Sequence, residues 1–181
     1  MRDDLIETLR QAQRFGFFGG RPIEEAAEHS RQYVDALGQL VPGTRIVDLG
    51  SGGGLPGLVL ADAYPTAAIT LLDRREKRTD FLRLAVRRLG WSHVEVVAAD
   101  VSALIAEVGD GTTPPFDVVT ARGFGPPEFT LRSAANLARA GGRIIISEPP
   151  DDDRWPEELL EECHVTRERH GAVSVFTAQD V

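Results

Sequence analysis

The sequence predicts an α/β protein with a seven-stranded, mostly parallel sheet, on three observations. Between residues 44 and 147, short runs of valine, isoleucine and leucine alternate with longer segments whose apolar residues recur at helical spacing. A glycine-rich turn follows the first run directly, as it does where a strand of an open sheet passes into a helix. Near the C-terminus, two further runs separated by His170-Gly171 predict an antiparallel hairpin. Strands joined through helices run parallel, so helices should cover both faces of the sheet.

The individual elements follow from this alternation in chain order. The expected parallel strands cover residues 45–49, 68–73, 94–98, 116–120 and 143–147. The expected helices between them cover residues 55–63, 75–89, 102–108 and 127–139. Gly141 and Gly142 end the last of these helices and start the fifth strand. The hairpin strands cover residues 163–169 and 172–177, and the acidic residues 151–162 link them to the rest of the sheet.

Residues 1–40 are predicted to form a helical cap on the sheet domain, which covers residues 41–181. Apolar residues at helical spacing indicate amphipathic helices over residues 3–14 and 22–38. An aromatic, glycine-rich joint over residues 15–20 connects these two helices. The chain is thus expected to hold one main domain with a small N-terminal addition.

The composition excludes several classes of function. The chain has 181 residues, and no apolar run approaches the roughly 20 residues that a membrane-spanning helix needs. Cys163 is the single cysteine and the four histidines are scattered, so neither an internal disulfide nor a metal site is expected. The acidic N-terminus, with no apolar stretch after it, indicates a cytoplasmic protein, which we expect to be a monomer.

The net charge of −8 belongs mainly to the C-terminal segment. Residues 148–181 contain ten acids and three arginines, a net charge of −7, which leaves about −1 on residues 1–147. The acidity therefore does not describe the surface around the predicted site. It does not exclude a nucleic-acid partner.

The first predicted strand ends in a glycine loop that begins with an acid. Asp48, Gly50, Gly52 and Gly54 form the pattern D-x-G-x-G-x-G, which is typical of methyltransferases that bind S-adenosylmethionine. A dinucleotide fingerprint requires glycine where Leu55 stands, and no Gly-Lys-Ser/Thr follows as in a P-loop. A carboxylate at Asp48 suits a ligand that carries an ammonium and a sulfonium group, whereas it would repel a pyrophosphate.

Two further acids follow the next two predicted strands. Asp73 ends the second strand, where a carboxylate can accept hydrogen bonds from both hydroxyls of a ribose. Asp100 follows the third strand and is placed to accept a hydrogen bond from an adenine amino group, with the backbone of Val101 and Ser102 beside the ring. Because the carboxyl ends of parallel strands meet at one edge, the loop and these acids together predict one S-adenosylmethionine site.

The glycine loop also resembles the first motif of a known family. Residues 47–57, which end in Leu-Pro-Gly, are similar to that motif in the small-subunit rRNA guanine-N7 methyltransferases, also called glucose-inhibited division protein B. Further resemblance lies in Leu71-Leu72-Asp73, Lys77-Arg78, Phe81-Leu82 and residues 116–124. The similarity covers roughly residues 44–142 with its order and spacing kept.

The resemblance implies a Rossmann-like class I methyltransferase that uses S-adenosylmethionine to methylate guanine N7 in small-subunit ribosomal RNA. It implies that five residues line the cofactor, namely Gly50, Leu55, Val101, Ser102 and Arg122. It also implies that Arg122 lies near the reaction centre as the catalytic residue. Guanine N7 carries a lone pair in the ring plane and needs no deprotonation, so this chemistry requires alignment and no general base.

The segments that would recognise the acceptor depart from the pattern of this family. Residues 1–43 lack its Trp-Asn…Asn-Leu-Thr segment, and its His-x-x-Asp-Ser motif is matched at best by residues 32–36. After the fifth strand, Ser147-Glu148-Pro149-Pro150 stands in place of a Lys-Gly, and an acid there argues against phosphate contact. Two alternatives therefore stay open: a small-molecule methyltransferase with a divergent cap, and a non-catalytic S-adenosylmethionine-binding interaction protein.

Two features outside the predicted site leave contact with RNA open. The helix after Asp73 carries seven basic residues, namely Arg74, Arg75, Lys77, Arg78, Arg83, Arg87 and Arg88. These side chains either contact RNA phosphates or form a solvated helix face with ion pairs along it. Phe17 and Phe18 in the joint either stack on a base or pack into the cap.

Overall fold

The computed structural model describes residues 2–149 and 154–180, and within these ranges it holds an alternating series of strands and helices. The strands are β1 (Arg45–Leu49), β2 (Ala68–Asp73), β3 (Val94–Ala98), β4 (Phe116–Ala121), β5 (Ala138–Ser147), β6 (Val165–His170) and β7 (Val173–Ala178). The helices are α1 (Asp3–Arg14), α2 (Ile23–Leu37), α3 (Gly57–Ala63), α4 (Glu76–Leu89), α5 (Val101–Gly109), α6 (Pro127–Ala135) and α7 (Glu157–Glu162).

The strands form one seven-stranded sheet in the order β3-β2-β1-β4-β5-β7-β6. The neighbours from β3 to β5 are parallel, whereas β7 runs antiparallel to both β5 and β6. The predicted mostly parallel sheet with a C-terminal antiparallel hairpin is confirmed. Strand order reverses at β1, which pairs with β2 on one side and β4 on the other, and ligands of open α/β sheets bind beside such a reversal.

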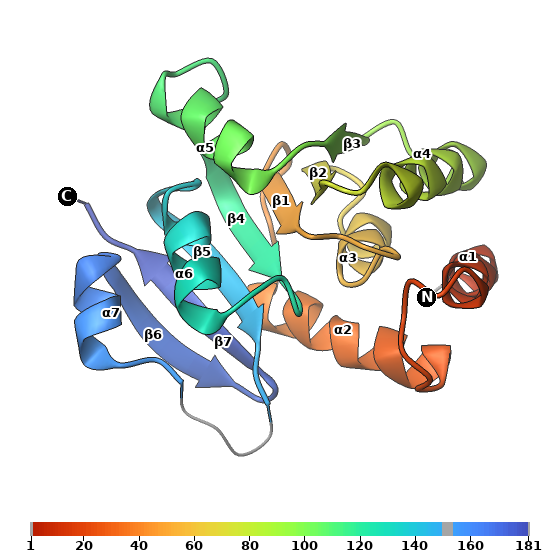
Figure 1. Cartoon of the computed structure of the whole chain (residues 1–181), viewed down its shortest axis with the longest axis horizontal. Helices are drawn as coiled ribbons and strands as arrows, with labels where there is room; N and C mark the ends of the chain where they lie inside the picture. The colour runs from red at the N-terminus through yellow and green to blue at the C-terminus, as the bar shows by residue number, and fades with distance from the viewer. Residues whose placement is uncertain (1, 150–153, 181) are drawn as a thin grey trace.

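Side chains that alternate along each strand build a separate core on each face of the sheet. Ile46 and Ile69 pack with α1 to α4, whereas Val47 and Leu72 pack with α5 to α7. The two sets of helices accordingly cover opposite faces (Figure 1). Continuous apolar runs such as Ile144-Ile145-Ile146 in β5 are what a strand buried on both faces requires.

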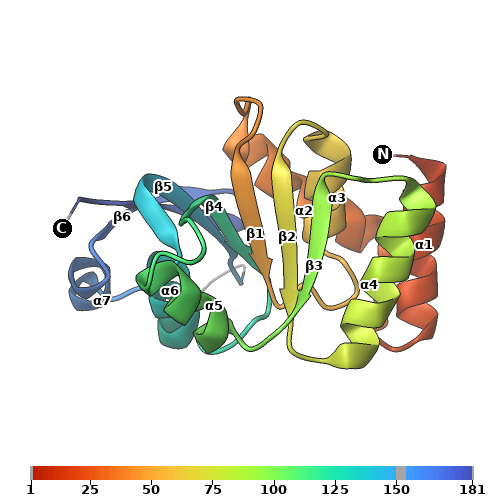
Figure 2. The same ribbon diagram turned by 90° about the horizontal axis from the view of Figure 1, so that it is seen from above.

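The two N-terminal helices pack on the sheet face that α3 and α4 also cover. Leu5, Leu9 and Tyr33 are fully buried, and α1 lies beside α4 (Figure 2). The Tyr33 hydroxyl donates a hydrogen bond to the backbone oxygen of Ala121 at 2.8 Å, which ties α2 to the end of β4. The division into a cap over residues 1–40 and a domain over 41–181 stays a prediction.

The sequence prediction is wrong about the boundary between α6 and β5. The predicted helix to residue 139 ends at Ala135, and β5 begins at Ala138, because the strand contains a bulge. Phe116 pairs with Ala138, but two residues further along β4 the partner is already Arg143. A Cβ on Gly142 would lie 2.7 Å from the Arg139 carbonyl oxygen, so the bulge needs glycine there.

The C-terminal part contains a helix where the sequence predicted only a link. Of the acidic residues 151–162, residues 157–162 form α7, while residues 151–153 lie outside the described part of the chain. The hairpin strands lie within two residues of their predicted limits. No helix of the described residues is long and apolar enough to cross a membrane.

Candidate functional site

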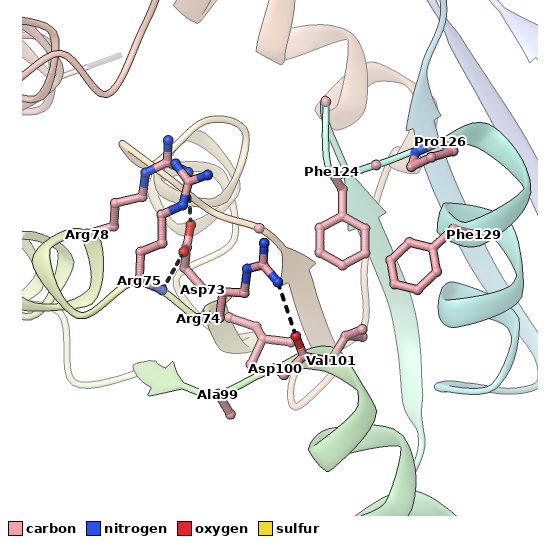
Figure 3. Close-up of a pocket in the computed structure, with 14 residues that line it drawn as sticks. Asp73, Arg74, Arg75, Arg78, Ala99, Asp100, Val101, Phe124, Pro126 and Phe129 are labelled. Atoms are coloured by element: carbon pink, nitrogen blue, oxygen red, sulfur yellow. Dashed lines mark hydrogen bonds and ion pairs between the residues drawn. The ribbon is translucent and has the colours of Figure 1, made fainter.

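A cavity of 410 Å³ lies at the carboxyl ends of the central strands, beside the reversal of strand order. Acids and arginines line one wall, and the rings of Phe124 and Phe129 face them from the other (Figure 3). Its lining consists of Gly50, Leu72, Asp73, Arg74, Arg75, Arg78, Ala99, Asp100, Val101, Gly123, Phe124, Gly125, Pro126 and Phe129. A volume of this size falls within the range of about 300–1,000 Å³ that small-molecule sites occupy.

The glycine loop after β1 contributes one residue, Gly50, to the lining of this cavity. Gly50 lines the cavity with a φ of 67°, and a Cβ there would lie 2.7 Å from a ring carbon of Phe124. Gly52 and Gly54 also have positive φ but lie deeper, where they shape the turn. A Cβ on Gly54 would come within 2.3 Å of Leu58, so this turn depends on glycine for both space and conformation.

Asp73 holds the glycine loop and lines the cavity at the same time. Its carboxylate accepts hydrogen bonds from the backbone N–H of Gly52 at 3.0 Å and of Arg75 at 2.9 Å. A guanidinium nitrogen of Arg78 lies 3.4 Å away, which is a long contact for an ion pair. A carboxylate has about four lone-pair positions, so Asp73 keeps acceptor capacity for a ligand hydroxyl.

Asp48 lies beneath the loop instead of along the cavity. Its side chain is fully buried, and the Thr120 hydroxyl donates a hydrogen bond to one carboxylate oxygen at 2.8 Å. The other oxygen has no hydrogen-bond partner among the described residues and faces the position where Gly57 would carry a Cβ. Burial raises the pKa of Asp48 to about 6, against the hydrogen bonds that stabilise its charge. Its direct contact with a ligand stays a prediction.

Asp100 and the first turn of α5 form the third corner of the cavity. Asp100 caps the helix, since its carboxylate accepts from the Ser102 backbone N–H at 3.1 Å and from the Ser102 hydroxyl at 2.9 Å. The backbone bond to Ser102 is the main reason that the pKa of Asp100 is lowered. Asp100 and Val101 line the cavity, whereas Ser102 contributes through the cap and is not among the lining residues.

The structure places the two remaining predicted residues away from this cavity. Leu55 is 4% exposed and packs in the core with α3. Arg122 lines a second cavity of 710 Å³, where its guanidinium lies 3.4 Å from the Ser30 hydroxyl. The two cavities share the segment Gly123, Phe124 and Gly125, so Phe124 stands at the junction between them.

The second cavity collects residues from the N-terminal and C-terminal parts of the chain. Arg21 lies just before α2 and His29 lies within it, whereas Arg154 precedes α7 and Arg169 lies in β6. Burial lowers the pKa of His29, and the nearby charges of Arg122 and Arg21 lower it further. None of these four residues was predicted as part of a site.

Glu148 at the end of β5 has a different role from the one its sequence position suggested. Its carboxylate is buried and lies 3.1 Å from the Arg154 guanidinium, and it also accepts a hydrogen bond from the Trp155 indole. The acid therefore anchors the segment after β5 through an internal ion pair. Its charge is balanced within the protein, so it does not by itself argue against an anion in the cavity.

The residues present fit S-adenosylmethionine on the chemistry of the donor set. Buried Asp73 offers oxygen acceptors on one wall, and half-exposed Asp100 offers another at the start of α5. Gly50 presents backbone without a side chain along the cavity, and the apolar Val101 and Phe129 supply faces for a flat ring. Among the described residues, no group of histidines, cysteines or acids could hold a metal ion.

Comparison with known proteins identifies the family. The chain matches the family model of rRNA small subunit methyltransferase G (GidB) over residues 9–179. It belongs to this family. The resemblance based on the glycine loop and the Leu-Pro-Gly sequence is thereby confirmed, and the family match extends through the N-terminal helices and the hairpin that the sequence motifs left out.

Individual relatives agree with this assignment. The chain is 42% identical over 136 residues to ribosomal RNA small subunit methyltransferase G of Laribacter hongkongensis, covering 72% of this chain and 63% of that protein. It is 31% identical to the protein of the same name from Thermobifida fusca, covering 97% of this chain and 76% of that one. The chain thus spans somewhat less than two thirds of the first relative and about three quarters of the second.

Solved structures support the fold alone. A SAM-dependent methyltransferase from Aquifex aeolicus superposes with a TM-score of 0.60 at 15% identity, covering 93% of this chain and 96% of that one. A mutant of MtNAS, also solved with S-adenosylmethionine, superposes with a TM-score of 0.63 at 16% identity. The predicted Rossmann-like class I methyltransferase architecture is therefore confirmed.

Proposed function

We propose that this protein is an S-adenosylmethionine-dependent methyltransferase that methylates guanine N7 in small-subunit ribosomal RNA, as a monomer in the cytoplasm. One observation carries the proposal: in a chain of this family, a nucleotide-sized cavity at the strand ends adjoins a second cavity, with Phe124 lining both. Two adjoining sites of this kind are what a reaction between a bound donor and a separate acceptor requires.

The first cavity takes the cofactor in this proposal. Asp73 accepts hydrogen bonds from the ribose hydroxyls, and Gly50 lets the ligand approach the backbone closely. Asp100 accepts a hydrogen bond from the adenine amino group, and Val101 packs against the ring. Asp48 acts from below by holding the loop through Thr120.

The second cavity takes the acceptor base. When bound, S-adenosylmethionine supplies an electrophilic methyl group, and guanine N7 already carries the lone pair that attacks it. No residue of this chain has to remove a proton, so the site can work by alignment alone. Arg122 lies beside the junction of the two cavities, where its charge can hold the RNA strand or the base.

Transfer of tritium from labelled S-adenosylmethionine tests the proposal. The purified chain would be incubated with 30S ribosomal subunits that lack the modification and, in parallel, with a fractionated metabolite extract. We expect label in the RNA and 7-methylguanosine after nuclease digestion. Label in a metabolite fraction would instead support a small-molecule methyltransferase. Micromolar cofactor binding with no transfer to either would support a non-catalytic binding protein.

A further inference from the structure

A third hollow, of 480 Å³, opens beside the cofactor cavity between the α1–α2 joint and the start of α4. Phe15 and Phe17 form one side of it, and Arg75, Lys77 and Arg78 form the other. Arg75 and Arg78 also line the cofactor cavity, so the two hollows are neighbours. Neither the cofactor nor the acceptor base of the proposed reaction occupies this hollow.

On the aromatic side of the hollow, the Phe15 ring is exposed to solvent and also contacts two other rings. Phe15 is 67% exposed, although its ring lies 5.9 Å from that of Phe17 and 6.0 Å from that of Phe81. Phe81 is buried and meets Phe17 edge to face at 5.6 Å, so the two inner rings hold the outer one in place. An aromatic face open to solvent is the kind of surface on which a nucleic-acid base stacks.

Phe18, one of the two residues that the sequence analysis considered for base stacking, does not line this hollow. A Cβ on Gly53 would lie 2.5 Å from its ring, so Phe18 packs directly on the glycine loop. The ring belongs to the partly buried set around the core. The exposed aromatic face of the joint is therefore that of Phe15.

The basic residues around α4 divide into paired and unpaired groups. Arg74, Arg78 and Arg83 form ion pairs with Asp100, Asp73 and Asp80, and Arg88 donates to the Gln11 amide oxygen. Within residues 2–149 and 154–180, no carboxylate lies within 4.0 Å of the cationic groups of Arg75, Lys77 or Arg87. Two of these three cations, Arg75 and Lys77, border the hollow.

Charge and shape thus point to the same occupant. Arg75 and Lys77 lie at the N-terminal end of a 14-residue helix, where positive charge is unfavourable unless an anion is present. Glu76 is the only carboxylate among the residues that line the hollow. An exposed ring beside unpaired cations suits a strand that presents alternating bases and phosphates.

We propose that this hollow binds single-stranded RNA adjacent to the methylated nucleotide, with one base stacked on Phe15 and a phosphate held by Arg75 and Lys77. The identity of the partner rests on the proposed function. The joint and the residue after it connect the sites physically, since Phe15 borders the hollow, Phe18 covers Gly53, and Arg21 lines the acceptor cavity. A strand that enters the acceptor cavity can thus continue along the joint to the hollow.

Binding of a fluorescein-labelled 12-nucleotide single-stranded RNA, followed by anisotropy, tests the proposal with F15A and K77A. We expect F15A to weaken RNA binding about fivefold or more, as loss of one stacked base does. K77A should reduce the slope of log affinity against log salt by about 0.7, as loss of one phosphate contact does. The matched controls L84A and R87A remove an exposed apolar and an exposed cationic side chain from the same helix, away from the hollow, and should match the wild type.

Calorimetric titration with S-adenosylhomocysteine separates a docking role from a structural one. Phe15 and Lys77 do not line the cofactor cavity, so both variants should keep the wild-type affinity for this ligand. An equal loss of RNA and S-adenosylhomocysteine affinity would mean that the joint only supports the glycine loop, which overturns the proposal. So would wild-type RNA binding by both variants, or no RNA binding by the wild type.

The methyl-transfer assay keeps this inference distinct from the proposed function. A wild-type protein that binds the RNA through Phe15 and Lys77 but transfers no methyl group would support the hollow and refute the reaction. Equal methylation of 30S subunits by the wild type, F15A and K77A would support the proposed reaction and refute RNA binding in the hollow.

Discussion

The cofactor side and the acceptor side of this site are positioned in different ways. On the cofactor side, the key acids follow successive strands and bond to their own neighbours, as Asp73 does to the Arg75 N–H and Asp100 to the Ser102 N–H. The acceptor side combines Arg21 and His29 near the N-terminus with Arg154 near the hairpin. Local structure therefore builds one side and tertiary packing the other, so substitutions should separate cofactor binding from acceptor binding.

The largest expected effect is on the glycine loop, where the cofactor side depends on a single conformation. Gly54 has a φ of 108°, and a Cβ would lie 2.3 Å from the fully buried Leu58. Gly54→Ala should lower the free energy of unfolding by about 3 kcal/mol, since strain and overpacking act together. Denaturant titration measures this loss.

Gly109→Ala is the matched control for this substitution. Gly109 ends α5, its φ is ordinary, and a Cβ there meets no atom within 4 Å. The control should stay within about 0.5 kcal/mol of the wild type. If the two alanine variants were equally stable, the loop would not impose the conformation on which the cofactor side is argued to depend.

The next effect concerns the buried carboxylate beneath the loop. Burial raises the pKa of Asp48 to about 6, above the value of about 3.9 for an unfolded chain. The folded protein therefore binds this proton more tightly, and the contribution of Asp48 to stability is present below pH 4 and is lost as the pH rises to 6. The shift corresponds to about 3 kcal/mol.

Asp48→Asn isolates this contribution, because the amide does not titrate and can still accept from Thr120. The unfolding free energy of the wild type minus that of the variant should fall by up to about 3 kcal/mol between pH 4 and pH 7. Urea titrations at several pH values measure this difference. A difference that is independent of pH would refute the raised pKa.

Asp73 and Asp100 should differ in their effect on cofactor affinity. Asp73→Ala removes a carboxylate with 4% of its side chain exposed and leaves the Gly52 N–H without its partner, so affinity should drop by about 1–3 kcal/mol. The Asp100 side chain is 52% exposed, so Asp100→Ala should cost less than 1 kcal/mol. Calorimetry with S-adenosylhomocysteine measures both.

Asp110→Ala serves as the control for these two acids. Asp110 is an exposed acid at the other end of α5, where it accepts from the Thr112 N–H, and its removal should leave cofactor affinity unchanged. If Asp100→Ala weakened binding more than Asp73→Ala, the ribose and adenine assignments would have to be revised.

The contrast between the two sides also explains what the sequence could predict. Strand-end residues such as Gly50, Asp73 and Asp100 are adjacent to recognisable strands, and parallel strands end at one edge, so their meeting place follows from topology. The same reasoning predicted the sheet, the helices on both of its faces and the hairpin. It did not give the bulge in β5, because the register depends on how Gly142 fits against the Arg139 backbone.

The acceptor side has no comparable signal in the sequence. His29 reaches the second cavity because α2 packs on the sheet and Tyr33 bonds to Ala121 88 residues away. The role of Glu148 depends on Arg154 and Trp155, whose bonds to it form only once the segment after β5 folds back. Phe124 offered one missed clue, since an aromatic residue between two glycines three residues after a strand end is placed to line the site there.

The most discriminating effect is expected for Arg122, to which the family resemblance assigned both cofactor binding and catalysis. In the structure Arg122 lines the acceptor cavity and not the cofactor cavity. Its guanidinium lies 3.4 Å from the Ser30 hydroxyl. Arg122→Ala should therefore lower kcat/KM for 30S subunits about tenfold, or about 1.4 kcal/mol, while S-adenosylhomocysteine affinity stays at the wild-type value.

Arg122→Lys keeps the charge but loses the planar pair of donors, so it distinguishes two roles. Recovery of most of the activity would mean that Arg122 acts as a positive charge beside the RNA backbone. A loss equal to that of the alanine variant would mean that directed hydrogen bonds position the acceptor. A parallel loss of cofactor affinity in both variants would mean that Arg122 contributes to cofactor binding as well as to acceptor binding, so that the two sides share this residue.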